Sequence, residues 1–144
     1  MIQFKFYDQA EDYLLKFAVI VACNNGKWVF CRHRHRNSWE LPGGRREAAE
    51  SIPDTARREL QEETGATSFT LSPVCVYSVT GKTRVNEGGE ESFGMLYTAE
   101  IHAFGELHSE ISEIILTDTI PKELTYPDIQ PLLFQKAKNF LSNA

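Results

Sequence analysis

The chain has 144 residues, of which 42% are hydrophobic, and a formal net charge of −5. This length suits one domain with a substantial core, and we place a single domain over residues 1–144. The negative charge argues against broad electrostatic binding to a nucleic-acid polymer. It does not exclude an anionic nucleotide, because bound metal ions can reverse the local field.

Cysteine usage and the amino-terminal segment indicate the cell compartment. Cys23, Cys31 and Cys75 are odd in number and lack metal-type spacing, which favours buried free thiols in a reducing environment. The first residues do not resemble a signal peptide, and no segment approaches the length of a membrane span. We therefore expect a cytoplasmic protein without a membrane partner.

The first third of the chain predicts strands joined by turns. Residues 2–7 alternate between apolar and polar types, as in an edge strand that could pair with a second subunit, so monomer and homodimer both stay open. Residues 14–23 are strongly apolar and predict a central strand. The Asn25-Gly26 pair predicts a hairpin turn into a partner strand over residues 27–33.

The remaining elements complete the expected architecture. Residues 70–79 and 92–102 predict two long strands, and the polar, glycine-containing segment 80–91 between them predicts a mobile loop. A short strand is expected at 113–118, and apolar periodicity predicts a helix over 127–141. This order fits the α/β class, with a mixed sheet between helices in an α/β/α sandwich.

The segment between Gly44 and Gly65 carries the most informative pattern. Ser51 is a good N-cap with Asp54 three residues later, and Pro53 suits the first turn of a helix. Gly65 suits the left-handed residue at which a helix ends. The sequence therefore predicts a helix that begins after Ser51 and ends at Gly65.

This helix carries a cluster of carboxylates. Glu59, Glu62 and Glu63 are spaced by three and four residues, so they share one face, and Arg58 can reach Glu62 at i+4. Like charges this close repel each other unless a cation lies between them. Their position late in the helix, where the dipole disfavours negative charge, favours a metal site over a solvated surface. Clustered carboxylate oxygens suit Mg2+ or Mn2+.

The full spacing, G-x5-E-x7-R-E-U-x-E-E-x-G-U with U a bulky aliphatic residue, resembles the Nudix box. The chain departs from the pattern at Ala66, which is smaller than the usual final residue, and at Ala49, where many members have glycine. The resemblance implies the Nudix fold over the whole domain. The matching residues are Gly44, Glu50, Arg58, Glu59, Leu60, Glu62, Glu63 and Gly65.

The resemblance also implies a reaction. Nudix enzymes cleave a diphosphate linkage in a nucleoside diphosphate bonded to another group X, by attack of water on phosphorus. Divalent metal, Mg2+ or alternatively Mn2+, bridges phosphate oxygens and activates the water. Arg58 is expected to orient carboxylates rather than to contact phosphate. The implied metal ligands are Glu59, Glu62 and Glu63, supported by Glu50 and by the main-chain carbonyl of Gly43 or Gly44.

The general base stays open between two residues. Glu63 is the candidate within the box. Glu110 is the candidate outside it, because it precedes the short strand, where related enzymes often carry another basic or metal-linked carboxylate. Glu87, Glu90 and Glu91 could close over substrate, although a solvated charged loop is the simpler interpretation.

Residues 32–36 form the basic cluster of the chain. On a strand, the three arginines would share one face and the two histidines the other. Arg32 occupies the position of a substrate-facing arginine in nucleotide-sanitising relatives, and arginine suits phosphate recognition. Arg34 and Arg36 are expected to be solvated. His33 and His35 without further ligands are weak evidence for zinc.

Substrate identity is the least determined property. Tyr126 is the best-placed aromatic residue for a nucleobase pocket, which lies at the start of the last helix in nucleotide-sanitising relatives. Residues 79–84 lack the proline and tyrosine that mark ADP-ribose and diadenosine polyphosphate hydrolases. We favour a MutT-type nucleoside triphosphate diphosphatase, acting on an unmodified or oxidised base as in 8-oxo-dGTP. The alternatives are an ADP-ribose, nucleotide-sugar or dinucleotide pyrophosphohydrolase and, in another class, a non-catalytic nucleotide-binding regulatory module.

Overall fold

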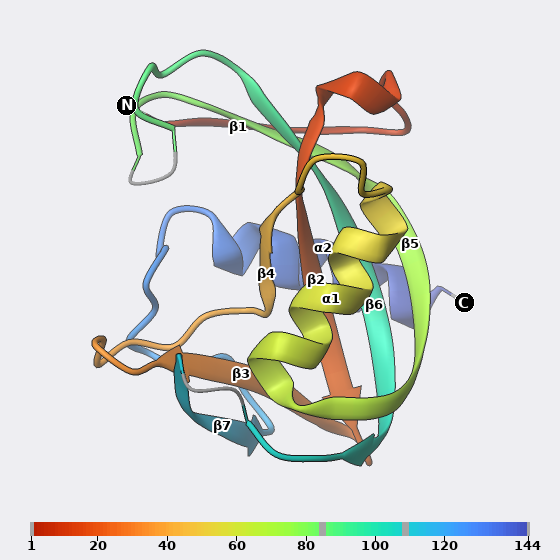
Figure 1. The fold of residues 1–144 in the computed structure, drawn as a ribbon. Coiled ribbons are helices and arrows are strands. Elements are labelled where there is room, and N and C mark those ends of the chain that lie inside the picture. Colours follow the sequence, from red (N-terminus) through yellow and green to blue (C-terminus); the bar gives the residue numbers. More distant parts are fainter. Residues whose placement is uncertain (1, 84–85, 108–109, 144) are drawn as a thin grey trace.

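The computed structural model describes residues 2–83, 86–107 and 110–143. Within these ranges the chain forms one sheet, two α-helices and a short 3-10 helix, η1 (Figure 1). The helices are α1 (Ile52–Thr64) and α2 (Gln130–Ser142), and η1 spans Asp12–Leu14. The strands are β1 (Gln3–Tyr7), β2 (Leu15–Asn24), β3 (Lys27–His33), β4 (Gly43–Arg45), β5 (Ala66–Thr80), β6 (Ser92–Phe104) and β7 (Ile111–Thr117).

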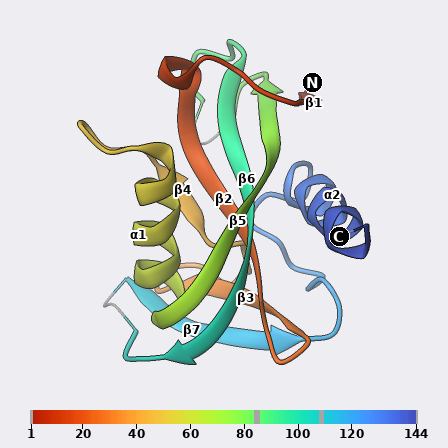
Figure 2. The same ribbon diagram turned by 90° about the vertical axis from the view of Figure 1, so that its right-hand side faces the viewer.

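The sheet has the order β1-β5-β6-β2-β3-β7, and β4 pairs with β2 beside this path. The β2–β6 pair is parallel, whereas the other pairs are antiparallel, so the sheet is mixed as expected. Figure 2 shows α1 and α2 on opposite sides of the strands. The α/β/α sandwich expected from the sequence is therefore confirmed.

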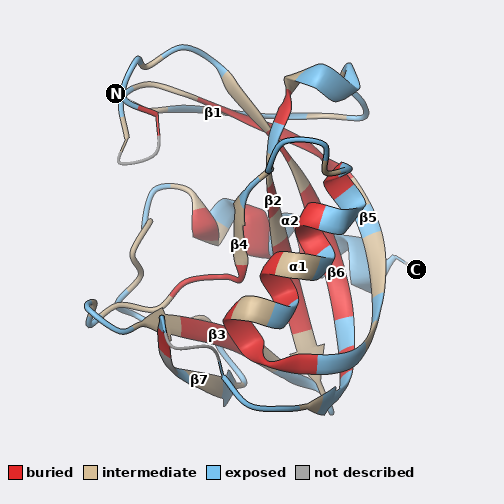
Figure 3. Ribbon diagram, in the orientation of Figure 1, coloured by how far each residue is buried: buried red, intermediate tan, exposed pale blue. Residues whose placement is uncertain are grey.

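The core is divided between the two faces of the sheet. On β2, Ile20 packs in the cluster beneath α1 and Val21 in the cluster beneath α2, because successive side chains of a strand point to opposite faces. Leu60 of α1 and Leu133 of α2 fill these two layers. The buried band through the central strands in Figure 3 follows from this arrangement. It explains why β2 is an almost continuous apolar run.

The ends of α1 follow the local sequence. Ser51 Oγ accepts a hydrogen bond from the Asp54 N–H at 3.2 Å, and Pro53 lies in the first turn. Gly65 adopts a left-handed conformation with φ of 77°, and its N–H donates to the carbonyl of Gln61. The predicted helix is confirmed at both ends.

Two predicted element starts are wrong by three residues or more, whereas the other bounds differ by two residues or fewer. Helix α2 begins at Gln130 rather than at residue 127, because Pro131 has no N–H to donate to the Pro127 carbonyl and so interrupts the helical hydrogen bonding there. The Tyr126 carbonyl instead accepts the N–H groups of Ile129 and Gln130 in a tight turn. Strand β5 begins at Ala66 rather than at residue 70, since its irregular pairing with β6 extends back to the end of α1.

The segment between β5 and β6 contains a turn in which Thr83 and Asn86 are bridged. Asn86 is buried, and its side-chain amide donates to the carbonyls of Gly81 and Glu90. Residues 84 and 85 lie outside the described residues, and mobility of this loop stays a prediction. None of the helices in the described ranges is long and apolar enough to cross a membrane.

Candidate active site

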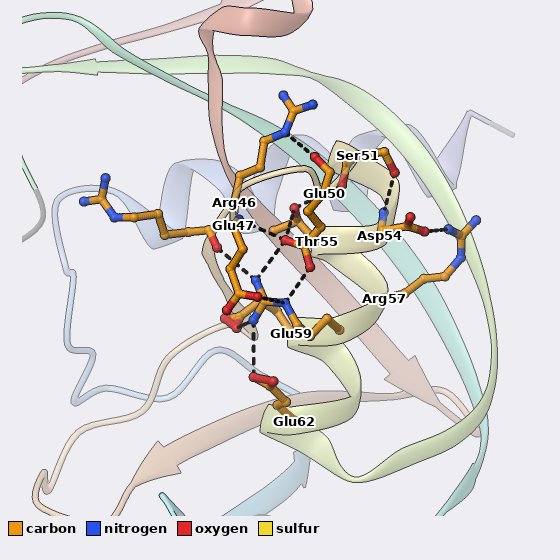
Figure 4. A network of polar contacts seen from close by, with 11 residues as sticks. Arg46, Glu47, Glu50, Ser51, Asp54, Thr55, Arg57, Glu59 and Glu62 are labelled. Carbon is orange, nitrogen blue, oxygen red and sulfur yellow. Dashed lines mark hydrogen bonds and ion pairs between the residues drawn. The ribbon is translucent and has the colours of Figure 1, made fainter.

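The carboxylates of the box converge on one guanidinium. Arg58 Nε donates to Glu50 Oε2 at 2.7 Å, while its Nη1 donates to Glu59 Oε1 at 2.7 Å and to Glu62 Oε2 at 3.3 Å (Figure 4). Its Nη2 also donates to the carbonyl of Arg45 on β4. Arg58 therefore joins the loop before α1, the helix and β4, and its orienting role in the reaction stays a prediction.

The carboxyl groups titrate differently because their surroundings differ. Hydrogen bonds from Arg58 hold the pKa of Glu50 down at about 2, despite partial desolvation. Burial, reinforced by the neighbouring charge of Glu63, raises the pKa of Glu59 to about 8. Burial also raises the pKa of Glu63. A divalent cation would relieve this accumulated negative charge, so the donor set fits a magnesium-type ion.

Two glycines allow β4 to lie close to its neighbours, Gly44 to α1 and Gly43 to β2. A β-carbon on Gly44 would overlap the Glu59 carboxylate, and one on Gly43 would lie 2.5 Å from the carbonyl oxygen of Ala18. The Gly43 N–H donates to Glu63 Oε1 at 2.8 Å. The Gly43 main chain thus lies against the Glu63 carboxylate through its N–H, and the metal-binding carbonyl expected at Gly43 or Gly44 stays a prediction.

His33 and Glu40 join the site from the other side of Glu63. His33 Nε2 lies 2.9 Å from Glu63 Oε2 and 3.3 Å from Glu40 Oε1. Hydrogen bonds to Glu40 and then to Glu63 raise the pKa of His33 to about 10, so an imidazolium joins two buried carboxylates. Sequence reasoning missed Glu40 and considered His33 only with His35, as weak evidence for zinc. The available signal was the two-residue spacing of Cys31 and His33, which puts both on one face of a strand.

The basic cluster differs from its expected geometry. Strand β3 ends at His33, and residues 34–36 form a turn in which the Arg36 N–H donates to the His33 carbonyl. The predicted alternation through residue 36 is therefore wrong. Arg36 is not a solvated side chain, because its Nη1 donates to Glu40 Oε2 at 2.9 Å and it is partly buried.

Arg32 and Glu110 lie at the edge of this region. Arg32 Nη2 donates to Glu113 Oε1 at 2.7 Å, and its Nη1 donates to the Arg36 carbonyl. Glu110 is exposed, and its carbonyl accepts the Arg34 N–H beside the end of β3. The structure brings neither side chain into the carboxylate cluster, so their roles stay predictions.

A cavity of about 210 Å3 opens next to the carboxylates, between the sheet and α2. Gly43 and Gly44 line it, which connects it to the box. Its walls are mainly apolar and include Tyr126, whose contact with a nucleobase stays a prediction. Polar groups come from Asn86 and from Gln130, whose Oε1 accepts the Leu41 N–H at 2.9 Å. Such a cavity suits a flat, partly apolar group with a few hydrogen-bonding atoms.

Comparison with known sequences agrees with this geometry. A family model described as NUDIX domain matches residues 13–128. The chain is 36% identical over 84 residues to a Bacillus subtilis (strain 168) protein named "Putative 8-oxo-dGTP diphosphatase YtkD", covering 58% of this chain and 52% of that protein. The match thus spans about half the length of this relative.

Solved structures share the fold. The chain resembles the Bacillus subtilis pyrophosphohydrolase BsRppH with a TM-score of 0.76 and 25% identity, over 96% of this chain and 90% of that one. It also resembles the NUDIX domain of Shewanella oneidensis NrtR, complexed with ADP ribose, with a TM-score of 0.68 and 19% identity over 88% of each chain. Because the family match spans most of the chain and includes the whole box, this protein belongs to the NUDIX domain family.

Proposed function

We propose that this protein is a Mg2+-dependent pyrophosphohydrolase that cleaves a nucleoside diphosphate-X linkage by attack of water on phosphorus. The observation that carries this proposal is the convergence of Glu50, Glu59 and Glu62 on Arg58. This cluster adjoins a mainly apolar cavity through Gly43 and Gly44.

The residues of the site would have two roles, metal binding and orientation of the metal-binding carboxylates. Glu59, Glu62 and Glu63, with Glu50 and the carbonyl of Gly43 or Gly44, would hold Mg2+ or alternatively Mn2+. The bound metal would supply charge neutralisation at the phosphates and a water with a lowered pKa. Arg58 holds Glu50 and Glu59 in place by charge-assisted hydrogen bonds.

Other residues would orient the Glu63 carboxylate, accept a proton from the attacking water or contact the phosphates. The Gly43 N–H and His33 fix the Glu63 carboxylate from two directions. Glu63 and Glu110 are the candidate general bases. Glu63 is also assigned to the metal, so Glu110 is the stronger candidate base. Because Glu110 is exposed and lies outside the carboxylate cluster, its side chain would have to reach the attacking water in the substrate complex. Arg32 remains our candidate for phosphate contact and would exchange Glu113 for substrate oxygens.

For the substrate we propose a nucleoside triphosphate with an unmodified or oxidised base, as in 8-oxo-dGTP. The products would be a nucleoside monophosphate and pyrophosphate. Support comes from the relative that is named for this activity and from the cavity, in which Tyr126 could contact a base while Gly43 and Gly44 lead to the carboxylates. The diphosphate end would then reach the metal ligands.

The test is product analysis with Mg2+ on a panel of unmodified and oxidised nucleoside triphosphates, ADP-ribose, a diadenosine polyphosphate and NADH. We expect monophosphate and pyrophosphate from triphosphates, and a loss of turnover by at least about 100-fold in Glu62→Gln. Glu106→Gln is the matched control, because it makes the same charge change at an exposed residue outside the site. Wild-type turnover in Glu62→Gln would contradict the metal assignment. Release of two monophosphates from a dinucleotide or sugar conjugate would show that the substrate belongs to that class and is not a triphosphate.

A further inference from the structure

A second group of potential metal ligands lies behind the magnesium-type carboxylates. Cys31 Sγ, His33 Nε2 and a carboxylate oxygen of Glu63 all lie within 4.8 Å of one another. Cys31 and His33 are two residues apart on β3, so they face the same side of the sheet. Glu63 reaches them from the last turn of α1, and Glu40 Oε1 lies 3.3 Å from His33 Nε2.

The donor types differ from those of a magnesium site. A thiolate, an imidazole and one carboxylate are the ligands of zinc-type ions, whereas Mg2+ prefers oxygen donors alone. Tetrahedral zinc, with bonds of about 2.0–2.3 Å, places its donors about 3.4–3.6 Å apart. His33 Nε2 and Glu63 Oε2 are 2.9 Å apart, and no two donor atoms of the group are more than 4.8 Å apart. Side-chain shifts of about 1 Å or less would therefore form the site.

Charge and access are compatible with a cation. Glu40 and Glu63 are both buried, and they already attract the cationic side chains of Arg36 and His33. A bound metal ion would replace the Nε2 proton of the His33 imidazolium and the proton of the buried Cys31 thiol, and both protons would be released to solvent. Cys31 is completely buried, but the side chain of His33 is 26% exposed and gives an approach from solvent. The Glu40 carboxylate, or a water molecule, would complete a four-coordinate site.

We propose that Cys31, His33 and Glu63, with Glu40 beside them, form a site for a thiophilic divalent cation such as Zn2+. Because Glu63 also belongs to the proposed magnesium site, zinc would withdraw a ligand from it and inhibit hydrolysis. The binding site stands on its own geometry, whereas this inhibitory consequence rests on the proposed function.

Binding is tested with Co2+ as a spectroscopic probe of the intact, reduced protein. We expect a thiolate-to-cobalt charge-transfer band and the visible bands of four-coordinate Co2+, displaced by Zn2+ but not by Mg2+. Both should disappear in Cys31→Ser, whose hydroxyl can still donate to the Glu40 carbonyl that Cys31 Sγ contacts at 3.5 Å. Cys23→Ser is the matched control, because it removes a partly exposed thiol elsewhere and should keep the bands.

A wild-type protein without the charge-transfer band, or a Cys31→Ser protein that keeps it, would overturn the site. Folding of each variant is checked by circular dichroism. If Cys31→Ser does not fold, His33→Gln serves instead, and four-coordinate Co2+ spectra that survive in it would equally overturn the site.

Inhibition is measured with Mg2+ saturating and Zn2+ varied. We expect Cys31→Ser to keep its Mg2+-only turnover and to need at least about tenfold more Zn2+ for half inhibition. Equal zinc sensitivity in both proteins would overturn the inhibitory role. If the protein binds Co2+ at Cys31 and His33 but hydrolyses no substrate, the proposed function fails and the thiophilic metal site stands. Failure of one hypothesis can therefore be told from failure of the other.

Discussion

Ala49 has a backbone conformation that glycine adopts more readily. It precedes Glu50 and has φ of 64°, in the left-handed region. This conformation costs a residue with a β-carbon about 1–2 kcal/mol. Glycine would remove that cost but would lose about 0.4–1 kcal/mol through its greater freedom in the unfolded chain. We therefore expect Ala49→Gly to raise the free energy of unfolding by about 0.5–1 kcal/mol.

The assay is urea unfolding, with a thermal scan as a second measure. A gain of this size corresponds to a rise of about 1–4 °C in Tm for a domain of this length. Mg2+ affinity should not change, because Glu50 keeps its hydrogen bonds from Arg58 and from Thr55 Oγ1. The variant thus separates backbone strain from the contacts of the site.

Ala48→Gly is the matched control, because Ala48 is also exposed but does not have positive φ. It should lower the free energy of unfolding by about 0.4–1 kcal/mol through the unfolded state alone. If the left-handed conformation of Ala49 is strained, the two substitutions should change the free energy of unfolding in opposite directions. Destabilisation of equal size by both substitutions would refute it.

Three further predictions concern the site itself. Gly44→Ala should destabilise the fold by about 1–3 kcal/mol in urea unfolding, because the new β-carbon displaces the Glu59 carboxylate. For the same reason, its turnover in a product assay should fall at least tenfold. Arg58→Gln should weaken Mg2+ binding measured by calorimetry, and Arg58→Lys should weaken it as well. One ammonium group cannot reproduce the separate contacts of Nε, Nη1 and Nη2, so wild-type affinity in the lysine variant would contradict this prediction. The pKa of Glu59 is raised to about 8, above its ordinary value of 4.5, so its contribution to stability is present below 4.5 and lost as pH rises to about 8. Metal-free wild type should therefore lose stability relative to Glu59→Gln between pH 5 and 8, and a flat difference in urea unfolding would contradict the burial argument.

Local chemistry made α1 predictable to the residue. Ser51, Pro53 and Gly65 act through main-chain groups within a few residues, so the helix ends follow from sequence alone. The strand sequence of β2 was equally informative, because burial on both faces leaves a continuous apolar run. The shared helical face of Glu59 and Glu62 follows from helical spacing in the same way.

Contacts that depend on a turn or on another element of the fold were not predictable in this way. Glu40 follows a turn and meets His33 and Arg36 only because its main chain pairs with Cys31. Helical spacing places Glu63 near Glu59, but it says nothing of the imidazolium that reaches Glu63 from β3. The later start of α2 had a local signal in Pro131, which has no N–H for the Pro127 carbonyl, and periodicity alone did not take it into account.

The position of the carboxylates on α1 explains why metal binding and stability should be coupled. They lie in the second half of the helix, where the dipole disfavours negative charge, and burial raises the pKa of both Glu59 and Glu63. Arg58 contacts Glu59 directly, yet the pKa of Glu59 is still raised, so one guanidinium does not neutralise the cluster. The metal-free fold therefore retains unfavourable electrostatic energy that a divalent cation would remove. Consequently Mg2+ should release a proton from Glu59 below pH 8, and calorimetry in buffers of different ionisation enthalpy should detect that proton in wild type and not in Glu59→Gln.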